Sequence, residues 1–247
     1  MKTDRKCIAS SLIVFLFIAI PLLANIIIVI AQGGDFIAYL PLILKAEGTP
    51  QPTQEPPGVA ILTNYTHYVD SFNHINIVGE VNNNTKNHLR SVEIVVKFFD
   101  DNDQLIETES TYTLLHNLPA DDKTCFIVSL RKPDDWDHYI FAPLSYATNG
   151  EPLANLPITD LSGTYNSDLH SYHILGNVTN SAGTAVQKVR PIGTLYNADG
   201  QVIGCEYTYV LATDLNPGQS SSFEIRFSGG EYSSQSTYRV QVDGDLD

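Results

Sequence analysis

The sequence is poor in basic residues and lacks the motifs on which many enzymes depend. Only 14 of its 247 residues are lysine or arginine, whereas 28 are acidic. After residue 56 the count is 10 basic against 24 acidic side chains. This negative charge repels phosphate groups, so nucleic acid is excluded as an expected partner. No Gly-x-Ser-x-Gly motif, phosphate-binding glycine loop or zinc-helix motif occurs. We therefore predict a protein without catalytic residues, cofactor or metal.

Charge is also missing from one long stretch near the N-terminus. Lys2, Arg5 and Lys6 are followed by an uncharged, mostly apolar run from Cys7 to Ala31. This run is long enough to span a bilayer, and the basic residues before it place the N-terminus in the cytoplasm. Residues 1–31 are thus predicted to be a cleaved signal peptide or an uncleaved signal anchor. Both alternatives put the rest of the chain outside the cytoplasm, either secreted or membrane-anchored.

Residues 32–57 form an apolar segment followed by a proline-rich one. Pro41 interrupts the apolar part, which disfavours a central strand or a continuous helix there. The run from Thr49 to Gly58 has a proline every two or three residues and favours extended polyproline II. We expect a stalk that holds the following domains away from the membrane. The alternative is a ligand for a proline-binding groove.

The remainder of the chain contains an internal duplication. Residues 74–130 align without a gap on residues 171–227, a shift of 97 positions, with thirteen identities. The identities include Gly79 with Gly176 and Asn83 with Asn180. A period this long corresponds to a whole domain. We predict two domains, residues 58–146 (first repeat) and 153–247 (second repeat).

Each repeat has the pattern of β-strands. In the first repeat Val92, Ile94, Val96 and Phe98 recur at every second position, which is typical of a half-buried strand. By the alignment, Leu195 is the core counterpart of Phe98. Clusters of Asn, Asp and Gly separate the strands, and no helical apolar stripe is present. The fold class is therefore all-β, with two tandem antiparallel β-sandwiches.

The same segments resemble a known family. Residues 79–83, 96–100 and 104–106 of the first repeat, and 176–180, 193–197 and 201–203 of the second, resemble the FxLYD domain of bacterial extracytoplasmic proteins. Val96 and Gly193 stand where that motif has Phe, and Asn197 replaces its Asp. The resemblance covers about residues 60–142 and 158–243. It implies an immunoglobulin-like sandwich, often joined to a signal or anchor, with no characteristic catalytic site.

The two repeats are joined by residues 143–156. This segment is too short for a long tether and too uneven for a proline rod. Its apolar residues Leu144, Tyr146, Leu153 and Leu156 are expected to pack against the adjoining sandwich ends. We therefore predict an end-to-end pair of domains with restricted bending.

Cysteine is scarce, because only Cys125 and Cys205 follow the leader. Their counterparts in the other repeat are Ser222 and Thr108, so neither repeat can contain a disulfide of its own. Free thiols against the sandwiches are the favoured prediction. A bridge between the domains or between molecules is the alternative.

Three groups of polar residues deserve a chemical interpretation. His170 and His173 form the one close histidine pair, but residues three apart on a strand point to opposite faces, which disfavours a metal site. The run from Asp100 to Asp103 is interpreted as a turn, with a weak calcium site as the alternative. Glu107 and Glu109 would lie on one strand face, roughly 7 Å apart, but no aromatic cleft is indicated beside them.

The single tryptophan marks the one candidate recognition surface. Trp136 and Tyr139 lie in an acidic loop, and exposed aromatic residues among polar ones often anchor glycans or proteins. The alternative, which we favour, is that Trp136 closes the open end of the sandwich. The function expected is a non-catalytic cell-envelope protein whose modules mediate protein interaction or spacing. Glycan or small-ligand binding is the second possibility, and an enzyme is the third.

Overall fold

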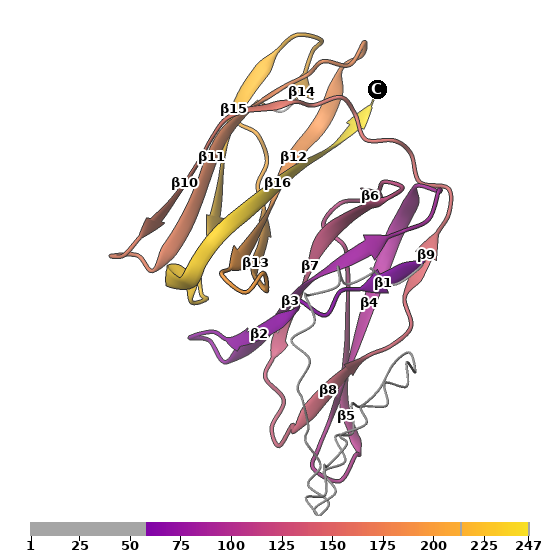
Figure 1. Cartoon of the computed structure of the whole chain (residues 1–247), viewed down its shortest axis with the longest axis vertical. Helices are drawn as coiled ribbons and strands as arrows, with labels where there is room; N and C mark the ends of the chain where they lie inside the picture. The colour runs from indigo at the N-terminus through magenta and orange to yellow at the C-terminus, as the bar shows by residue number, and fades with distance from the viewer. Residues whose placement is uncertain (1–57, 213, 247) are drawn as a thin grey trace, which may run out of the picture. The chain divides into compact units, whose positions relative to one another are not determined.

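The computed structural model of the chain describes residues 58–212 and 214–246 (Figure 1). The predicted leader and proline-rich stalk lie outside the described residues. Within the described part, η1 (Tyr232–Ser234) is a single turn of 3₁₀ helix and all other regular elements are strands. No helix in this part is long and apolar enough to span a membrane.

The first repeat consists of two antiparallel sheets. In one sheet β3 (His74–Asn83) is central, with β7 (Asp122–Arg131) on one side and β1 (Val59–Ile61) and β2 (Thr66–Val69) on the other. The second sheet is centred on β4. Its strands are β4 (Leu89–Phe99), β5 (Leu105–Tyr112), β6 (Asn117–Leu118), β8 (His138–Phe141) and β9 (Ser145–Ala147).

The second repeat has the same two sheets in the same strand order. Its strands are β10 (Ile158–Asn166), β11 (Ser171–Thr179), β12 (Val186–Asn197), β13 (Val202–Tyr207), β14 (Asp214–Leu215), β15 (Ser220–Phe227) and β16 (Gln235–Leu246). In one sheet, β11 lies between β10 and β15. In the other sheet β12 is central, with β13 and β14 along one edge and β16 along the other. All pairs are antiparallel, which confirms the predicted all-β fold of antiparallel sandwiches.

The shift of 97 residues holds in the pairing register as well as in the sequence. Ile77 pairs with Val128 in the first repeat, and Ile174 pairs with Ile225 in the second. The same shift relates β4–β5 to β12–β13, including a bulge at the end of each central strand. The duplication therefore extends to the hydrogen-bonded framework of both repeats.

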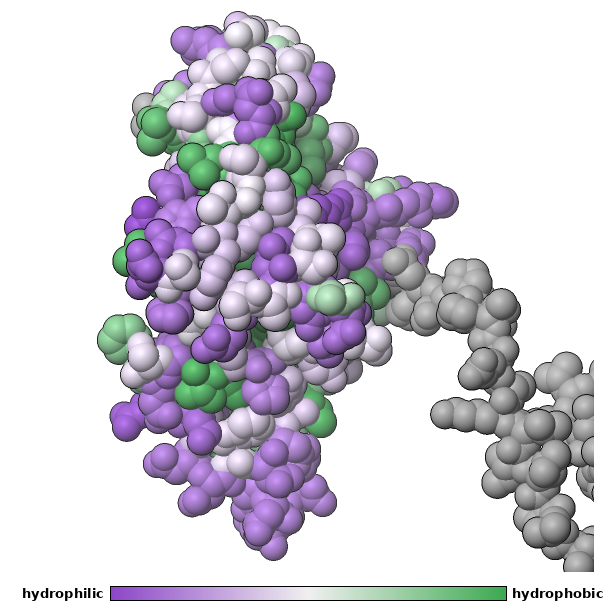
Figure 2. All heavy atoms as spheres, turned by 60° about the vertical axis from the view of Figure 1, so that its left-hand side comes forward, coloured by the Kyte–Doolittle hydropathy of each residue, from purple (hydrophilic) through white to green (hydrophobic). Residues whose placement is uncertain are grey.

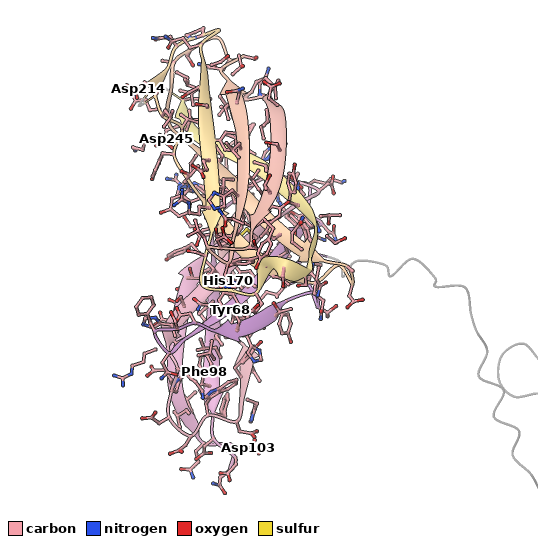
Figure 3. All side chains as sticks on the ribbon, turned by 90° about the vertical axis from the view of Figure 1, so that its left-hand side faces the viewer. Tyr68, Phe98, Asp103, His170, Asp214 and Asp245 are labelled. Carbon is pink, nitrogen blue, oxygen red and sulfur yellow. A yellow bond between two sulfur atoms is a disulfide. The ribbon has the colours of Figure 1, made fainter. Side chains whose placement is uncertain are left out.

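Each repeat encloses its own core between its sheets. Val92, Ile94, Val96 and Phe98 are all fully buried, as their alternation predicts. Leu195, the counterpart of Phe98, is fully buried in a separate cluster with residues from β11 and β15. Figure 3 shows Phe98 within its sandwich and Asp103 at the tip of a hairpin. The inward phase of the strands was thus predicted correctly.

Two of the identities have the same structural task in both repeats. The Nδ2 group of Asn83 donates to the carbonyl oxygens of Asn87 and Leu118. The Nδ2 group of Asn180 donates in the same way to the carbonyl oxygens of Thr184 and Leu215, the equivalent residues. The conserved pair Gly79 and Gly176 leaves room for a phenylalanine ring: a Cβ at either position would lie 2.7 Å from Phe126 or Phe223. These contacts explain why the copies agree at positions that are not strongly apolar.

Candidate functional site

The predicted recognition residues Trp136 and Tyr139 are both partly buried and pack against the first core. The Trp136 ring is half-buried and meets the Phe98 ring edge-on at 5.8 Å. Tyr139 lies 6.2 Å from Trp136, and its hydroxyl is 3.3 Å from Nδ1 of His67. Burial raises the pKa of Tyr139 to about 12. The rings thus cover the core, while their role in recognition stays a prediction.

The histidine segment forms a hydrogen-bonded chain that the sequence did not predict. Ser171 Oγ lies 2.8 Å from His173 Nε2, and His173 Nδ1 lies 2.6 Å from a Glu224 oxygen. The order is that of a Ser–His–carboxylate triad, but the burial is reversed. Ser171 is only 2% exposed, whereas Glu224 is exposed at the surface. A substrate would not reach the hydroxyl, so the chain is best explained as a tie between β11 and β15.

The acidic turns use their carboxylates to bind the backbone. Asp100 Oδ1 accepts hydrogen bonds from the amides of Asn102 and Gln104, and Asn197 does the same in the second repeat. Asn197 therefore makes the same turn as Asp100. Glu107 and Glu109 each accept a bond from the amide of the next residue, on the exposed strand β5.

The largest departure from the sequence-based prediction is at the junction between the repeats. Cys125 and Cys205 form a disulfide, with their Cα atoms 5.9 Å apart. The favoured prediction of free thiols is therefore wrong, and the alternative of a bridge between domains is correct. The bridge forms because outward-facing residues of β7 and β13 meet, which inspection of either repeat alone does not reveal.

An apolar cluster shared by both repeats surrounds this disulfide. It consists of the two cysteines with Val78, Leu115, Ile192 and Val202, all buried. The expected end-to-end contact through the linker is thus replaced by packing between outward-facing strand residues. Of the linker side chains, Leu153 joins this cluster, Leu144 and Leu156 pack against the separate cores, and Tyr146 is exposed.

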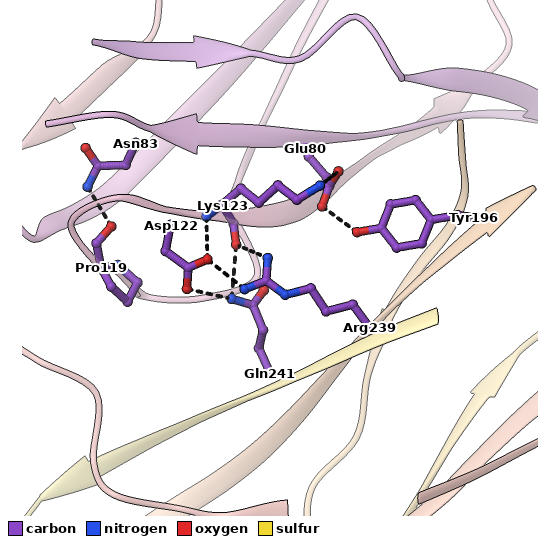
Figure 4. Close-up of polar contacts among 8 residues, drawn as sticks. All are labelled: Glu80, Asn83, Pro119, Asp122, Lys123, Tyr196, Arg239 and Gln241. Carbon is purple, nitrogen blue, oxygen red and sulfur yellow. Dashed lines mark hydrogen bonds and ion pairs between the residues drawn. The ribbon is translucent and has the colours of Figure 1, made fainter. Parts of the chain in front are cut away.

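A buried carboxylate lies beside the apolar cluster. Glu80, on β3, is fully buried and accepts three bonds through its two carboxylate oxygens. Asn64 of the first repeat donates at 2.8 Å. Figure 4 shows the other two donors, Lys123 of the first repeat at 2.8 Å and the Tyr196 hydroxyl of the second repeat at 2.6 Å. Burial raises the pKa of Tyr196, and the neighbouring Glu80 raises it further. Tyr196 therefore remains a neutral donor across the junction.

Further polar contacts extend the junction beyond Glu80. Arg239 of β16 donates to Asp122 Oδ1 at 2.6 Å and to the Lys123 carbonyl at 2.9 Å, and Gln241 donates to the same carbonyl (Figure 4). A shallow cleft of about 590 Å³ adjoins these residues. Its basic groups are already paired with carboxylates or carbonyls, so it does not form a ready anion site.

A second, smaller cleft is lined in part by Cys205 of the disulfide. It has a volume of about 370 Å³ and is lined by residues of both repeats, including Tyr68, Ser129 and Glu206. Burial raises the pKa of the Glu206 carboxyl and also that of Tyr68, whose hydroxyl lies 3.4 Å from that of Tyr232. Among the described residues no group of three or more acidic, histidine or cysteine side chains is arranged to hold a metal ion.

Comparison with known proteins gives little beyond this geometry. No family model and no curated protein matches the chain. Among solved structures, red sea bream transglutaminase matches at 12% identity and a TM-score of 0.22, over 74% of this chain and 29% of that one. An exo-chitosanase of Amycolatopsis orientalis matches at 10% identity and a TM-score of 0.26, over 73% and 25%. The chain thus spans under a third of either protein, and these similarities carry no functional argument.

The sequence did contain one signal of the junction. The repeats differ in chemical type at outward-facing positions of matching strands, as in Cys125 against Ser222, Ile127 against Glu224 and Glu80 against Asn177. A difference in chemical type at an outward position indicates that this face has different surroundings in the two repeats. This comparison identifies the face of β3 and β7 without a structure.

Replacing Glu80 by alanine is expected to lower the free energy of unfolding by about 3 kcal/mol, because the half-buried Lys123 ammonium and the Tyr196 hydroxyl lose their acceptor. Chemical denaturation of the full chain would measure the change. Glu107→Ala is the matched control, since that carboxylate is exposed and its loss should cost less than about 0.5 kcal/mol. Equal stability of the two variants would contradict the role of Glu80 at the junction.

Proposed function

We propose that this chain is a non-catalytic protein of a bacterial cell envelope, located outside the cytoplasm, whose sandwiches act as one stiff module for spacing or protein interaction. The observation that carries the proposal is the junction, where a disulfide, an apolar cluster and a buried carboxylate join the two repeats. Domain contacts of ordinary size permit relative motion. Three kinds of contact at one junction favour a unit that transmits position without bending.

The location is supported by two independent features. Disulfides form and persist in oxidising compartments outside the cytoplasm. The basic start and uncharged run of residues 1–31 are typical of export. Kinship with the FxLYD domain, which we also propose, agrees with both. The expected partner is an envelope protein or glycan. If the N-terminal segment is not cleaved, it would anchor the chain in the membrane.

The absence of catalysis is part of the proposal and is supported by how the polar groups are used. The carboxylates of Asp100, Glu107 and Glu109 are bonded to nearby backbone amides. The hydroxyl of the Ser171–His173–Glu224 chain is buried. Nucleophilic or acid–base chemistry needs a group that is accessible to substrate and is not already bonded to the backbone. None of these groups meets both conditions.

Thiol alkylation in whole cells tests the proposed location. Cells expressing the full chain are quenched with acid, and their protein is denatured and treated with a mass-tagged maleimide before and after reduction. We expect Cys125 and Cys205 to react only after reduction. A variant without residues 2–31, kept in the cytoplasm, is the control and should react at both cysteines directly. Direct reaction of both cysteines in the full chain would contradict an extracytoplasmic location.

A further inference from the structure

Each repeat contributes a different face to the junction. The first repeat supplies the outward residues of β3 and β7 together with the loop at Leu114, and we call this the receiving face. The second repeat supplies outward residues of β12, β13 and β16, which we call the docking face. Because the two repeats share one fold and register, each also has the face that it does not use. A free receiving face remains on the second repeat and a free docking face on the first.

The free receiving face carries apolar side chains at junction positions. Leu175 is the counterpart of Val78, and Leu211 is the counterpart of Leu114. Val78 and Leu114 pack in the junction cluster, whereas Leu175 is exposed and Leu211 is 84% exposed. Ser222, also exposed, stands in the place of Cys125. The second repeat thus exposes two leucines at the positions where the first repeat packs against its neighbour in the junction.

The free docking face shows the same feature. Leu105 corresponds to Val202, which is buried in the junction, yet Leu105 is 55% exposed. Lys97 and Thr194 are counterparts, and they pair with Ile140 and Arg239 on the neighbouring strands. Ile140, which is exposed, therefore occupies the position that Arg239 has in the junction. On the side of the molecule drawn in Figure 2, apolar groups form separate patches on a largely hydrophilic surface.

The edge of β5 on the free docking face is uncovered in the described part of the chain, which also indicates an unused contact surface. In the junction the edge of β13 is covered by the first repeat, since the Val202 amide donates to the Asn64 carbonyl at 2.8 Å. The matching strand β5 has no such cover among the described residues. Its Thr108 and Ser110 amides are instead bonded by the side chains of the preceding glutamates. These bonds shield the edge from indiscriminate pairing but leave its side chains accessible.

The two free faces also carry one pair of opposite charges at matching positions, although Arg226 already contacts Glu224 of its own face at 3.4 Å. Ser129 and Glu206 line the same cleft at the junction. Their counterparts are Arg226 on the free receiving face and Glu109 on the free docking face. A contact built like the junction would bring this arginine close to this glutamate, where opposite charges set register and partner choice.

We propose that the free receiving face of one copy binds the free docking face of a second copy, in the geometry of the internal junction. The contact would be reversible, because Ser222 and Thr108 replace the disulfide and Asn177 replaces the buried Glu80. Two different faces meet in such a contact, so copies join head to tail, as a ring where the rotation between copies closes and otherwise as a filament. This inference goes beyond the proposed function and does not depend on the location of the protein.

Engineered cysteines at the two counterpart positions test the proposal. Full-length Thr108→Cys and Ser222→Cys chains, both in a Cys7→Ser background, are purified in mild detergent, mixed and gently oxidised. We expect a disulfide-linked dimer in the mixture and none from either variant alone. Ser236→Cys, an exposed position on β16, replaces Ser222→Cys in the control mixture and should give no dimer. Mass spectrometry verifies that the native Cys125–Cys205 bridge is intact in every variant.

Two results would overturn the proposal. One is a mixture of Thr108→Cys and Ser222→Cys that yields no more dimer than the control mixture. The other is a dimer of Ser222→Cys alone that equals the mixed dimer, which would indicate contact between two identical faces. In the background of the paired cysteines, Leu175→Asp and Leu211→Asp together should abolish the dimer. Persistence of the dimer in that variant would likewise count against the apolar contacts described above.

Discussion

Replacing Cys125 and Cys205 together by alanine is expected to lower the free energy of unfolding by about 4 kcal/mol, because the bridge closes a loop that is long in sequence. The two cysteines are 80 positions apart, so the bridge removes much of the freedom of the unfolded chain. The folded state loses little packing, since alanine still fits the apolar cluster around Val78 and Ile192. The effect should therefore arise mainly from the unfolded ensemble.

Guanidinium titration of the double variant against the natural chain measures this difference. The natural chain with its disulfide reduced should approach the stability of the variant. Thr108→Ala with Ser222→Ala is the matched control, because these are the same two positions in the opposite repeats, and it should change stability by less than about 0.5 kcal/mol. Unchanged stability of the double cysteine variant would show that the bridge does not constrain the chain.

Truncating Phe98 to alanine is expected to lower the free energy of unfolding of the first repeat by about 4 kcal/mol, because it leaves a cavity in a fully buried site. Leu195→Ala should act similarly in the second repeat, at about 3 kcal/mol. Trp136 contacts Phe98 and is the sole tryptophan, so its fluorescence reports on the first repeat. Thermal melting followed by this fluorescence should shift strongly with Phe98→Ala.

The control for the core substitution is Leu105→Ala, which removes a large apolar side chain from an exposed position at the start of β5, opposite Phe99. Its melting curve should stay close to that of the natural chain. A Phe98→Ala curve that coincides with the Leu105→Ala curve would mean that the inward phase of β4 has been assigned wrongly.

The cores could be predicted from sequence because the relevant physics is local. On a strand, side chains alternate between faces, so the apolar set from Val92 to Phe98 identifies its own inward side. Turns are equally local: Asp103 and its counterpart Gly200 both have positive φ values, of 59° and 76°. Asp and Gly tolerate this left-handed region, which is why the alignment pairs them.

The junction could not be predicted in the same way, because it depends on which faces meet. The partner of Cys125 lies in another repeat, and no period within β7 indicates it. Glu80 is a strand residue between apolar neighbours, and its three donors come from distant parts of the chain. Trp136 packs against the first core beside Phe98, which agrees with the favoured interpretation that this ring covers the core.

The asymmetric placement of the two cysteines has a consequence for folding. Tandem domains of one fold can misassemble by exchanging equivalent strands. If β7 and β15 changed places, Cys125 would lie on the free receiving face of the second repeat, away from Cys205. If β5 and β13 changed places, Cys205 would lie on the free docking face of the first repeat. The bridge can close only when both strands have sorted into their own repeats, so mis-sorted molecules would keep free thiols. Formation of the disulfide thus distinguishes chains whose strands are in their own repeats from chains whose strands have been exchanged.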